Sequence, residues 1–203
     1  MMWQNLQRDW FLAVNQFAQS TPVLRAPMRL YAEYGVAPFA ALLLVAWWWA
    51  RRNQEPRTMA AALWAPAGTL LALGLNQPLV HLTHAPRPYT VFPRALVLGA
   101  HSGDYSLPSD HAVTADAVAA GVLLTDRRLG VATALAALVM AFARVYVGAH
   151  FPLDVIVGLL LGSVVTCLGY LAVRPVLIWV VAWLTRTPLR PLIITTETSL
   201  ARC

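Results

Sequence analysis

Residues 155–173 read VIVGLLLGSVVTCLGYLAV, a run of 19 residues that contains no charged side chain. An α-helix needs about 20 apolar residues to cross the hydrocarbon core of a bilayer, so this run predicts a membrane-spanning helix. Other apolar runs, with at most one charge each, occupy 34–50, 58–79, 111–125 and 129–148. The sequence therefore predicts an all-α fold, a polytopic bundle of about five or six transmembrane helices.

The composition of the whole chain agrees with this interpretation. Of the 203 residues, 59% are hydrophobic and 12% are charged, whereas about a quarter of the residues of a typical soluble domain are charged. The net charge of +6 comes from arginines in short loops between the apolar runs. This pattern is typical of membrane topology, and we expect no nucleic-acid partner. No linker or repeat divides residues 1–203, which are predicted to form a single domain.

Two segments do not resemble simple spans. Residues 9–24 are amphipathic, which predicts an N-terminal helix lying in the membrane interface. Residues 175–184, PVLIWVVAWL, are apolar but too few to cross a bilayer alone. This second segment can extend the last spanning helix, re-enter the membrane or lie along its surface.

Arginine counts predict the orientation of the bundle. With five alternating spans, one side of the membrane receives Arg51, Arg52, Arg57, Arg127, Arg128, Arg174, Arg186, Arg190 and Arg202. The positive-inside rule makes that side cytoplasmic. The histidines fall on or beside the opposite face: His81, His84, His101, His111 and His150. We therefore expect a functional site that opens on the extracytoplasmic face.

Three short strings occupy this face: APRPY at 85–89, PSDH at 108–111 and ARVYVGAHFPLD at 143–154. In the third string, Asp154 follows His150 by one helical turn. Its carboxylate is predicted to accept the Nδ1–H of His150 and leave Nε2 free as a nucleophile.

The remaining polar residues of the strings suit an anion. Arg87 and Arg144 carry planar guanidinium groups that match phosphate oxygens. Ser109 is predicted at the start of a helix, where free N–H groups attract negative charge. His111 supplies a second imidazole that can protonate a departing oxygen. These residues predict phosphoryl transfer without a metal or cofactor, and the other histidines have no ligand-like spacing to a carboxylate or cysteine.

The three strings resemble the motifs of the type 2 phosphatidic acid phosphatase (PAP2) superfamily of integral membrane lipid phosphatases. Those motifs are Lys-x6-Arg-Pro, Pro-Ser-Gly-His and Ser-Arg-x5-His-x3-Asp, and the resemblance covers about residues 80–154. It implies a PAP2-like helical membrane core. It also implies that His150 forms a phosphohistidine, that Asp154 orients it and that His111 acts as general acid. The phosphate would be held by Arg87, Ser109 and Arg144.

Three positions depart from the family pattern. Val80 stands where the first motif has its lysine, so one phosphate-binding cation is missing. His84, or His81, is a candidate auxiliary residue that partly replaces it. Asp110 occupies the position of the motif glycine and is interpreted as an N-capping residue. Ala143 replaces the serine before Arg144.

The resemblance favours a metal-independent phosphatase of the bacterial cytoplasmic membrane that acts on a lipid phosphate or diphosphate. Within the family the chain is similar to bacterial undecaprenyl diphosphate phosphatases, with phosphatidylglycerophosphate or phosphatidate phosphatases as the alternative. A second interpretation is a non-catalytic protein that binds anionic lipids, because Val80 replaces the phosphate-binding lysine of the motif. A lipid transporter remains open because Asp116 lies within a predicted span, although we interpret Asp116 as a structural polar contact.

Overall fold

A computed structural model describes residues 2–195, with side chains from Gln7 onward, so Arg202 and Cys203 lie outside the described residues. This part of the chain is helical and contains no strand, which confirms the predicted all-α fold class. The helices are α1 (Met2–Ser20), α2 (Pro22–Tyr34), α3 (Val36–Asn53), α4 (Pro56–Thr83), α5 (Pro88–Val91), α6 (Asp110–Thr125), α7 (Arg127–Tyr146), α8 (Pro152–Leu184) and α9 (Arg190–Ile193).

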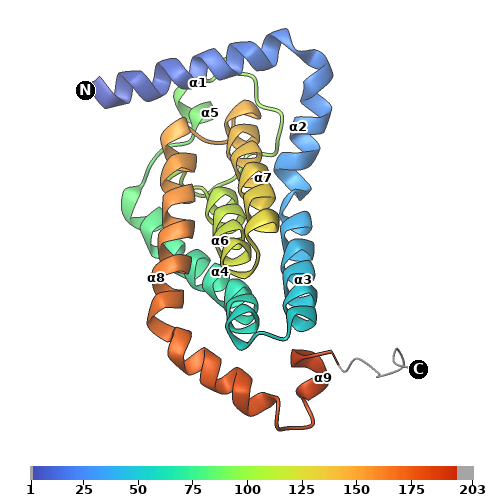
Figure 1. The fold of residues 1–203 in the computed structure, drawn as a ribbon. Coiled ribbons are helices and arrows are strands. Elements are labelled where there is room, and N and C mark those ends of the chain that lie inside the picture. Colours follow the sequence, from blue (N-terminus) through green and yellow to red (C-terminus); the bar gives the residue numbers. More distant parts are fainter. Residues whose placement is uncertain (1, 196–203) are drawn as a thin grey trace.

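Helix α6 lies in the middle of the bundle and packs against α3, α4, α7 and α8 (Figure 1). Its buried side chains are mostly alanine and valine, which allow neighbouring backbones to approach closely. A Cβ added at Gly162 of α8 would lie 2.6 Å from the Val113 oxygen and 2.8 Å from the Ala117 nitrogen. Glycine at this position therefore lets α8 contact the α6 backbone directly. This contact fixes α6, which carries His111, against α8, which carries Asp154.

By length and composition, three segments of the described chain can cross a membrane: Pro56–Val91, Arg127–Tyr146 and Pro152–Leu184. Helices α2 and α3 make a fourth candidate when they are taken as one span bent by 57°. The 16 residues of α6 are about 24 Å long, shorter than a hydrocarbon core of about 30 Å. Because four other helices surround α6, its length does not have to match the lipid. These candidates reach five, the lower end of the expected five or six, only when α6 is included.

The bend between α2 and α3 falls at Gly35. A Cβ at this position would collide with the Tyr31 carbonyl oxygen and with the end of the Met140 side chain on α7. The hydroxyl of Tyr31 donates a hydrogen bond to the Ala136 carbonyl oxygen at 2.9 Å. These contacts hold α2 against α7, next to the end of the bundle where the three strings meet.

Helix α1 lies across that end of the bundle (Figure 1). Phe11 is fully buried and packs edge-to-face on Phe151, with 5.3 Å between the ring centroids. Trp10 and Phe17 are exposed on the outside of the same helix. The segment predicted to lie at the interface, 9–24, is divided at Thr21, where α1 has ended and α2 begins. Its place in the membrane interface stays a prediction.

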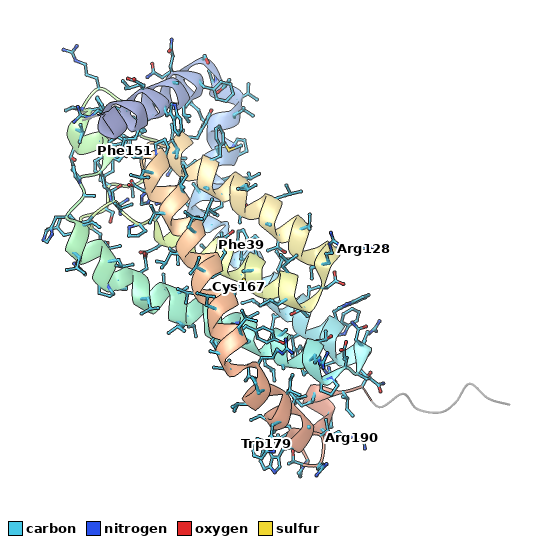
Figure 2. The ribbon with its side chains drawn as sticks, turned by 60° about the vertical axis from the view of Figure 1, so that its left-hand side comes forward. Phe39, Arg128, Phe151, Cys167, Trp179 and Arg190 are labelled. Atoms are coloured by element: carbon cyan, nitrogen blue, oxygen red, sulfur yellow. The ribbon has the colours of Figure 1, made fainter. Side chains whose placement is uncertain are left out.

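Residues 175–184 extend α8, one of the three possibilities that the sequence left open. Helix α8 has 33 residues and is about 50 Å long, which exceeds the thickness of a hydrocarbon core. Its last turns, near Trp179, lie at the opposite end of the molecule from Phe151 (Figure 2). There the chain turns back, and Trp47 Nε1 donates to the Leu192 carbonyl oxygen at 3.1 Å.

Candidate active site

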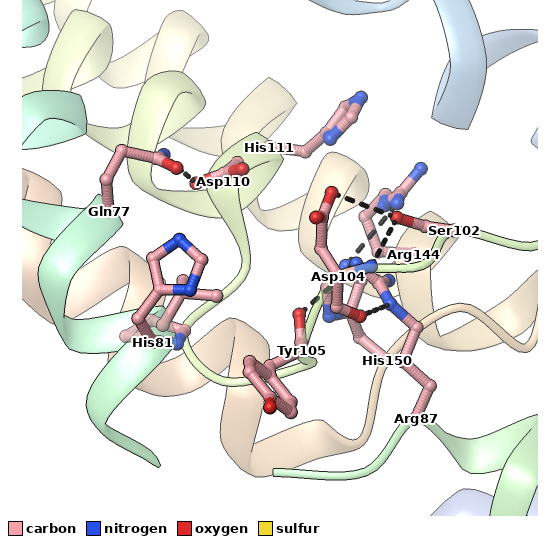
Figure 3. Close-up of a pocket in the computed structure, with 12 residues that line it drawn as sticks. Gln77, His81, Arg87, Ser102, Asp104, Tyr105, Asp110, His111, Arg144 and His150 are labelled. Carbon is pink, nitrogen blue, oxygen red and sulfur yellow. Dashed lines mark hydrogen bonds between the residues drawn. The ribbon is translucent and has the colours of Figure 1, made fainter. Parts of the chain in front are cut away.

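The three strings meet around a cavity of about 270 Å³ (Figure 3). Four of the predicted site residues line it: Arg87, His111, Arg144 and His150. Asp154 and Ser109 are buried and are not among the lining residues. The other residues that line the cavity are Gln77, Val80, His81, Ser102, Asp104, Tyr105, Pro108 and Asp110.

His150 stands in the loop between α7 and α8, and its side chain is 3% exposed. Its Nδ1 atom lies 2.9 Å from the backbone oxygen of Ser106 and 3.7 Å from Oδ2 of Asp154. The direct hydrogen bond predicted between His150 and Asp154 is therefore replaced by one to a backbone carbonyl. Because a carbonyl oxygen only accepts, Nδ1 carries the proton and Nε2 is unprotonated.

Asp154 supports this arrangement from behind. Its Oδ2 atom accepts a hydrogen bond from the backbone nitrogen of Phe151 at 2.8 Å and another from the hydroxyl of Ser106. Phe151 follows His150 in the chain, and Ser106 carries the carbonyl oxygen that accepts from Nδ1 of His150. The Asp154 carboxylate therefore holds both sides of this loop together and places a negative charge near the ring. Ser106 belongs to none of the three strings, and no pattern in the sequence singled it out.

The unprotonated Nε2 of His150 accepts hydrogen bonds from two guanidinium groups. It lies 3.3 Å from Nη1 of Arg87 and 3.4 Å from Nη2 of Arg144. Arg87 is held by the carbonyl oxygens of Asp104 at 2.8 Å and Ala149 at 3.2 Å. Arg144 Nη1 donates to the Ala32 carbonyl oxygen of α2 at 3.1 Å. Two fixed positive groups next to a nucleophile suit the oxygens of a phosphate.

Burial lowers the pKa of His150 below its ordinary value of 6.5, and the positive charges of Arg144 and Arg87 lower it further. Asp154 acts in the opposite direction but does not offset the burial. The imidazole is consequently neutral near pH 7, which is the form that a nucleophile requires.

His111 is the second residue of α6. Its ring lines the cavity and points toward the side on which α2 lies (Figure 3). Within the described residues, no hydrogen bond engages its imidazole. A partly exposed imidazole with free ring nitrogens, in the same cavity as the nucleophile, can deliver or accept a proton.

Ser109 is the N-cap residue of α6, as the sequence predicts, but its side chain makes no capping hydrogen bond. Its hydroxyl is buried and has no partner among the described residues. Its backbone nitrogen donates to the Asp154 carbonyl oxygen at 3.1 Å. Ser109 thus joins the start of α6 to α8 behind the cavity wall, and its contact with phosphate stays a prediction.

Asp110 was interpreted as an N-cap, and the structure corrects this because Ser109 occupies that position. Oδ1 of Asp110 accepts hydrogen bonds from Asn76 Nδ2 at 2.7 Å and Gln77 Nε2 at 3.0 Å. Its side chain therefore ties the first turn of α6 to α4 and forms part of the cavity wall.

Val80, at the position of the motif lysine, lines the cavity and contributes no charge. Of the two histidines considered as replacements, His81 lines the cavity. His84 lies outside the lining and packs on Tyr105, with 4.7 Å between ring centroids. His81 is thus better placed than His84 to face a bound anion. Asp116 lies outside the lining of this cavity, at the close contact between α6 and Gly162.

The chain is similar in sequence to curated proteins. The chain is 28% identical over 164 residues to undecaprenyl-diphosphatase BcrC of Bacillus subtilis, and the match covers 81% of each protein. It is 30% identical over 166 residues to an undecaprenyl-diphosphatase of Sulfolobus acidocaldarius, covering 81% of this chain and 76% of that protein.

Two solved structures share the fold. LpxE of Aquifex aeolicus superposes with a TM-score of 0.58 at 24% identity, covering 80% of this chain and 93% of LpxE. A transmembrane PAP2 type phosphatidylglycerolphosphate phosphatase from Bacillus subtilis gives a TM-score of 0.60 at 19% identity, covering 81% and 84%. The sequence profile of the PAP2 superfamily matches residues 61–178. The chain is therefore an integral membrane protein that belongs to the PAP2 superfamily of lipid phosphatases.

Proposed function

We propose that this protein hydrolyses a lipid diphosphate, with undecaprenyl or another polyprenyl diphosphate as the best candidate, through a phosphohistidine intermediate on His150. The observation that carries the proposal is the unprotonated Nε2 of His150 between two guanidinium groups, in a cavity that His111 shares. The curated relatives named undecaprenyl-diphosphatase support the choice of a polyprenyl diphosphate.

In the first step, Nε2 of His150 attacks the terminal phosphorus while the bond to the bridging oxygen breaks. Arg87 and Arg144 neutralise the oxygens of the transferred group, whose charge is spread out in the transition state. The negative charge of the bound substrate favours the imidazolium form of His111, which gives its proton to the departing oxygen. The lipid monophosphate leaves. The Nδ1–H bond to Ser106 and the nearby Asp154 stabilise the positive charge on the phosphorylated ring.

In the second step, a water molecule attacks the phosphorus of phosphohistidine. His111 is now neutral and takes a proton from this water, and the N–P bond breaks as the new P–O bond forms. Inorganic phosphate departs, His150 regains its free Nε2, and His111 is again protonated for the next cycle. The two guanidinium groups take the place that a metal ion has in other phosphoryl-transfer sites, so no metal takes part in either step.

The proposed location is the bacterial cytoplasmic membrane, with the cavity open to the extracytoplasmic face. The distribution of arginines supports this orientation, because the loops and the C-terminal segment rich in arginine are assigned to the cytoplasm. The diphosphate head group would then reach the cavity from the outer leaflet while its tail stays in lipid.

Phosphate release from a panel of lipids tests the proposal. The purified protein is assayed in EDTA with a polyprenyl diphosphate, the matching monophosphate, phosphatidylglycerophosphate and phosphatidate. We expect the highest kcat/KM with the diphosphate, and a loss of at least about 1,000-fold in His150→Ala. A second arm isolates the acid-labile phosphoprotein that forms in rapid-quench experiments.

Other outcomes separate the alternatives. Strict dependence on Mg²⁺ contradicts the metal-independent mechanism. Highest kcat/KM with a glycerolipid monophosphate identifies the enzyme as a phosphatidylglycerophosphate or phosphatidate phosphatase. Tight lipid binding by a folded protein that releases no phosphate from any of these lipids identifies a non-catalytic lipid-binding protein and refutes the proposed activity.

A further inference from the structure

We propose that Arg29 on α2 forms a second phosphate subsite, which binds the phosphate of the lipid diphosphate that stays on the lipid. Through this contact the enzyme would distinguish diphosphates from monophosphates. The inference rests on the proposed function and specifies the substrate class of the same site.

A second cavity, of about 310 Å³, adjoins the catalytic cavity. The two cavities share Arg87, Ser102, His111 and Arg144 in their linings, whereas His150 lines only the first. The phosphorus that His150 attacks therefore belongs to the first cavity. His111, the residue that protonates the departing oxygen, lines both cavities, and the wall of the second is formed partly by α2.

The charged residues of the two cavities differ. In addition to the shared arginines, the first cavity has the carboxylates of Asp104 and Asp110. The second has the guanidinium of Arg29 and the carboxylate of Glu33. The second cavity is thus the more positive of the two, and a second phosphate group is attracted toward it. The position of the motif lysine, Val80, adds no cation to the first cavity.

The local structure of α2 explains why Arg29 reaches this place. Arg29, Ala32 and Glu33 are spaced three and four residues apart and so lie on one face of the helix. That face is fixed next to the catalytic site, because Arg144 Nη1 donates to the Ala32 carbonyl oxygen at 3.1 Å. The bend at Gly35 and the hydrogen bond of Tyr31 to α7 keep the helix there.

Within the described residues, the Nε atom is the part of the Arg29 guanidinium that Glu33 contacts. The distance from Nε to Oε1 of Glu33 is 3.1 Å, and no other hydrogen bond holds the Arg29 side chain. The Nη groups are left for a ligand, and the side chain is 57% exposed, so it can adjust to an anion at small cost.

The chemistry of a diphosphate gives this residue a role. When the bridging P–O bond breaks, negative charge develops on the phosphate that remains on the lipid, on the His111 side of the reaction. A guanidinium there stabilises the departing group while His111 protonates it. A lipid monophosphate has no second phosphate, so Arg29 has nothing to bind in its hydrolysis.

The test compares Arg29→Ala with a charge-matched control, Arg94→Ala. Arg94 is an exposed arginine in the loop after α5 and lines neither cavity. Each purified protein is assayed with a polyprenyl diphosphate and with the monophosphate of the same tail. We expect Arg29→Ala to lower kcat/KM for the diphosphate by about 10- to 100-fold and for the monophosphate by less than about 3-fold. Arg94→Ala should change both by less than about 2-fold.

Inhibition gives a second measurement that does not need turnover of the monophosphate. Arg29→Ala should weaken inhibition by inorganic diphosphate by about 10-fold and leave inhibition by orthophosphate unchanged. Equal losses on both substrates together with equal weakening of both inhibitors, or no loss at all, overturn the assignment of Arg29. A wild-type protein that hydrolyses neither lipid instead refutes the proposed function, so the two failures are distinguishable.

Discussion

The backbone oxygen of Ser106 accepts the Nδ1–H of His150 at 2.9 Å, in a place where the sequence predicts the carboxylate of Asp154. The carboxylate lies 3.7 Å from the same nitrogen and binds the Ser106 hydroxyl and the Phe151 N–H instead. The tautomer of the nucleophile is thus set by a main-chain acceptor, and the aspartate supplies charge and support. Each of these two roles can be tested separately.

Asp154→Asn should lower kcat by about 10- to 100-fold and leave KM nearly unchanged. The amide removes the negative charge that stabilises phosphorylated His150, but the carbonyl of Ser106 still holds Nδ1–H, so Nε2 remains free. Steady-state phosphate release measures the effect, with His150→Ala as the limit of complete loss. A loss as large as that of His150→Ala contradicts a supporting role for Asp154.

Ser106→Ala should destabilise the protein by about 1–2 kcal/mol and reduce kcat by less than about 10-fold. The substitution removes the hydroxyl that donates to Asp154 but keeps the backbone oxygen that accepts from His150. Thermal unfolding in detergent and the turnover number provide the two measurements. Ser102→Ala, in the same loop but without contact to Asp154, is the matched control for stability. Unchanged stability in Ser106→Ala speaks against a functional hydrogen bond.

His111→Ala should impair hydrolysis of a poor leaving group more than that of a good one. When a lipid monophosphate is hydrolysed, the departing lipid alcohol has an alkoxide-like oxygen that needs a proton. The nitrophenolate that departs from a nitrophenyl ester does not need one. We expect a loss of about 100- to 1,000-fold with the alkyl ester and about 10-fold or less with the nitrophenyl ester. Equal losses on both esters contradict the assignment of His111 as general acid.

The buried imidazole of His150 predicts that stability decreases in mild acid. The unfolded chain takes up a proton near pH 6.5, whereas burial lowers the pKa of His150 in the folded protein. As the pH falls below 6.5, the unfolded state therefore binds more protons, and the free energy of unfolding decreases. His150→Gln removes this titration and keeps a neutral polar group. Melting temperatures between pH 7.5 and 5 should fall less steeply in His150→Gln than in the wild type. Parallel curves contradict the lowered pKa.

Much of this protein is predictable from local sequence. Apolar runs indicate membrane helices because lipid cannot hydrogen-bond a bare backbone, and this requirement does not depend on tertiary structure. The all-α class was predicted in this way, and the helical structure confirms it. The PAP2 resemblance was carried by the three short strings, and the superfamily match confirms it. Arg87, His111, Arg144 and His150 also lie together as predicted, since each stands in a short string at one end of the helices.

Other features depended on contacts between distant segments. The apolar run at 111–125 predicts a membrane-spanning helix, but α6 is shorter than a bilayer core and is enclosed by neighbouring helices. From the sequence, Asp110 was interpreted as an N-capping residue, but its side chain accepts hydrogen bonds from the amides of Asn76 and Gln77 on α4. Hydropathy and spacing describe a segment alone, and neither indicates which helix will pack beside it.

The sequence alone thus determined the lipid solvent, the helical class and the residue types around the anion, because these follow from side-chain chemistry at short spacing. Only the tertiary structure decided that Ser106, 44 residues from His150, sets its tautomer. It also brought Arg29 of α2, which meets α3 at a bend, to the second cavity beside the catalytic one. The physical reason is that backbone carbonyls and helix bends leave no local pattern in the residues, and their partners are chosen by the packing of the whole bundle.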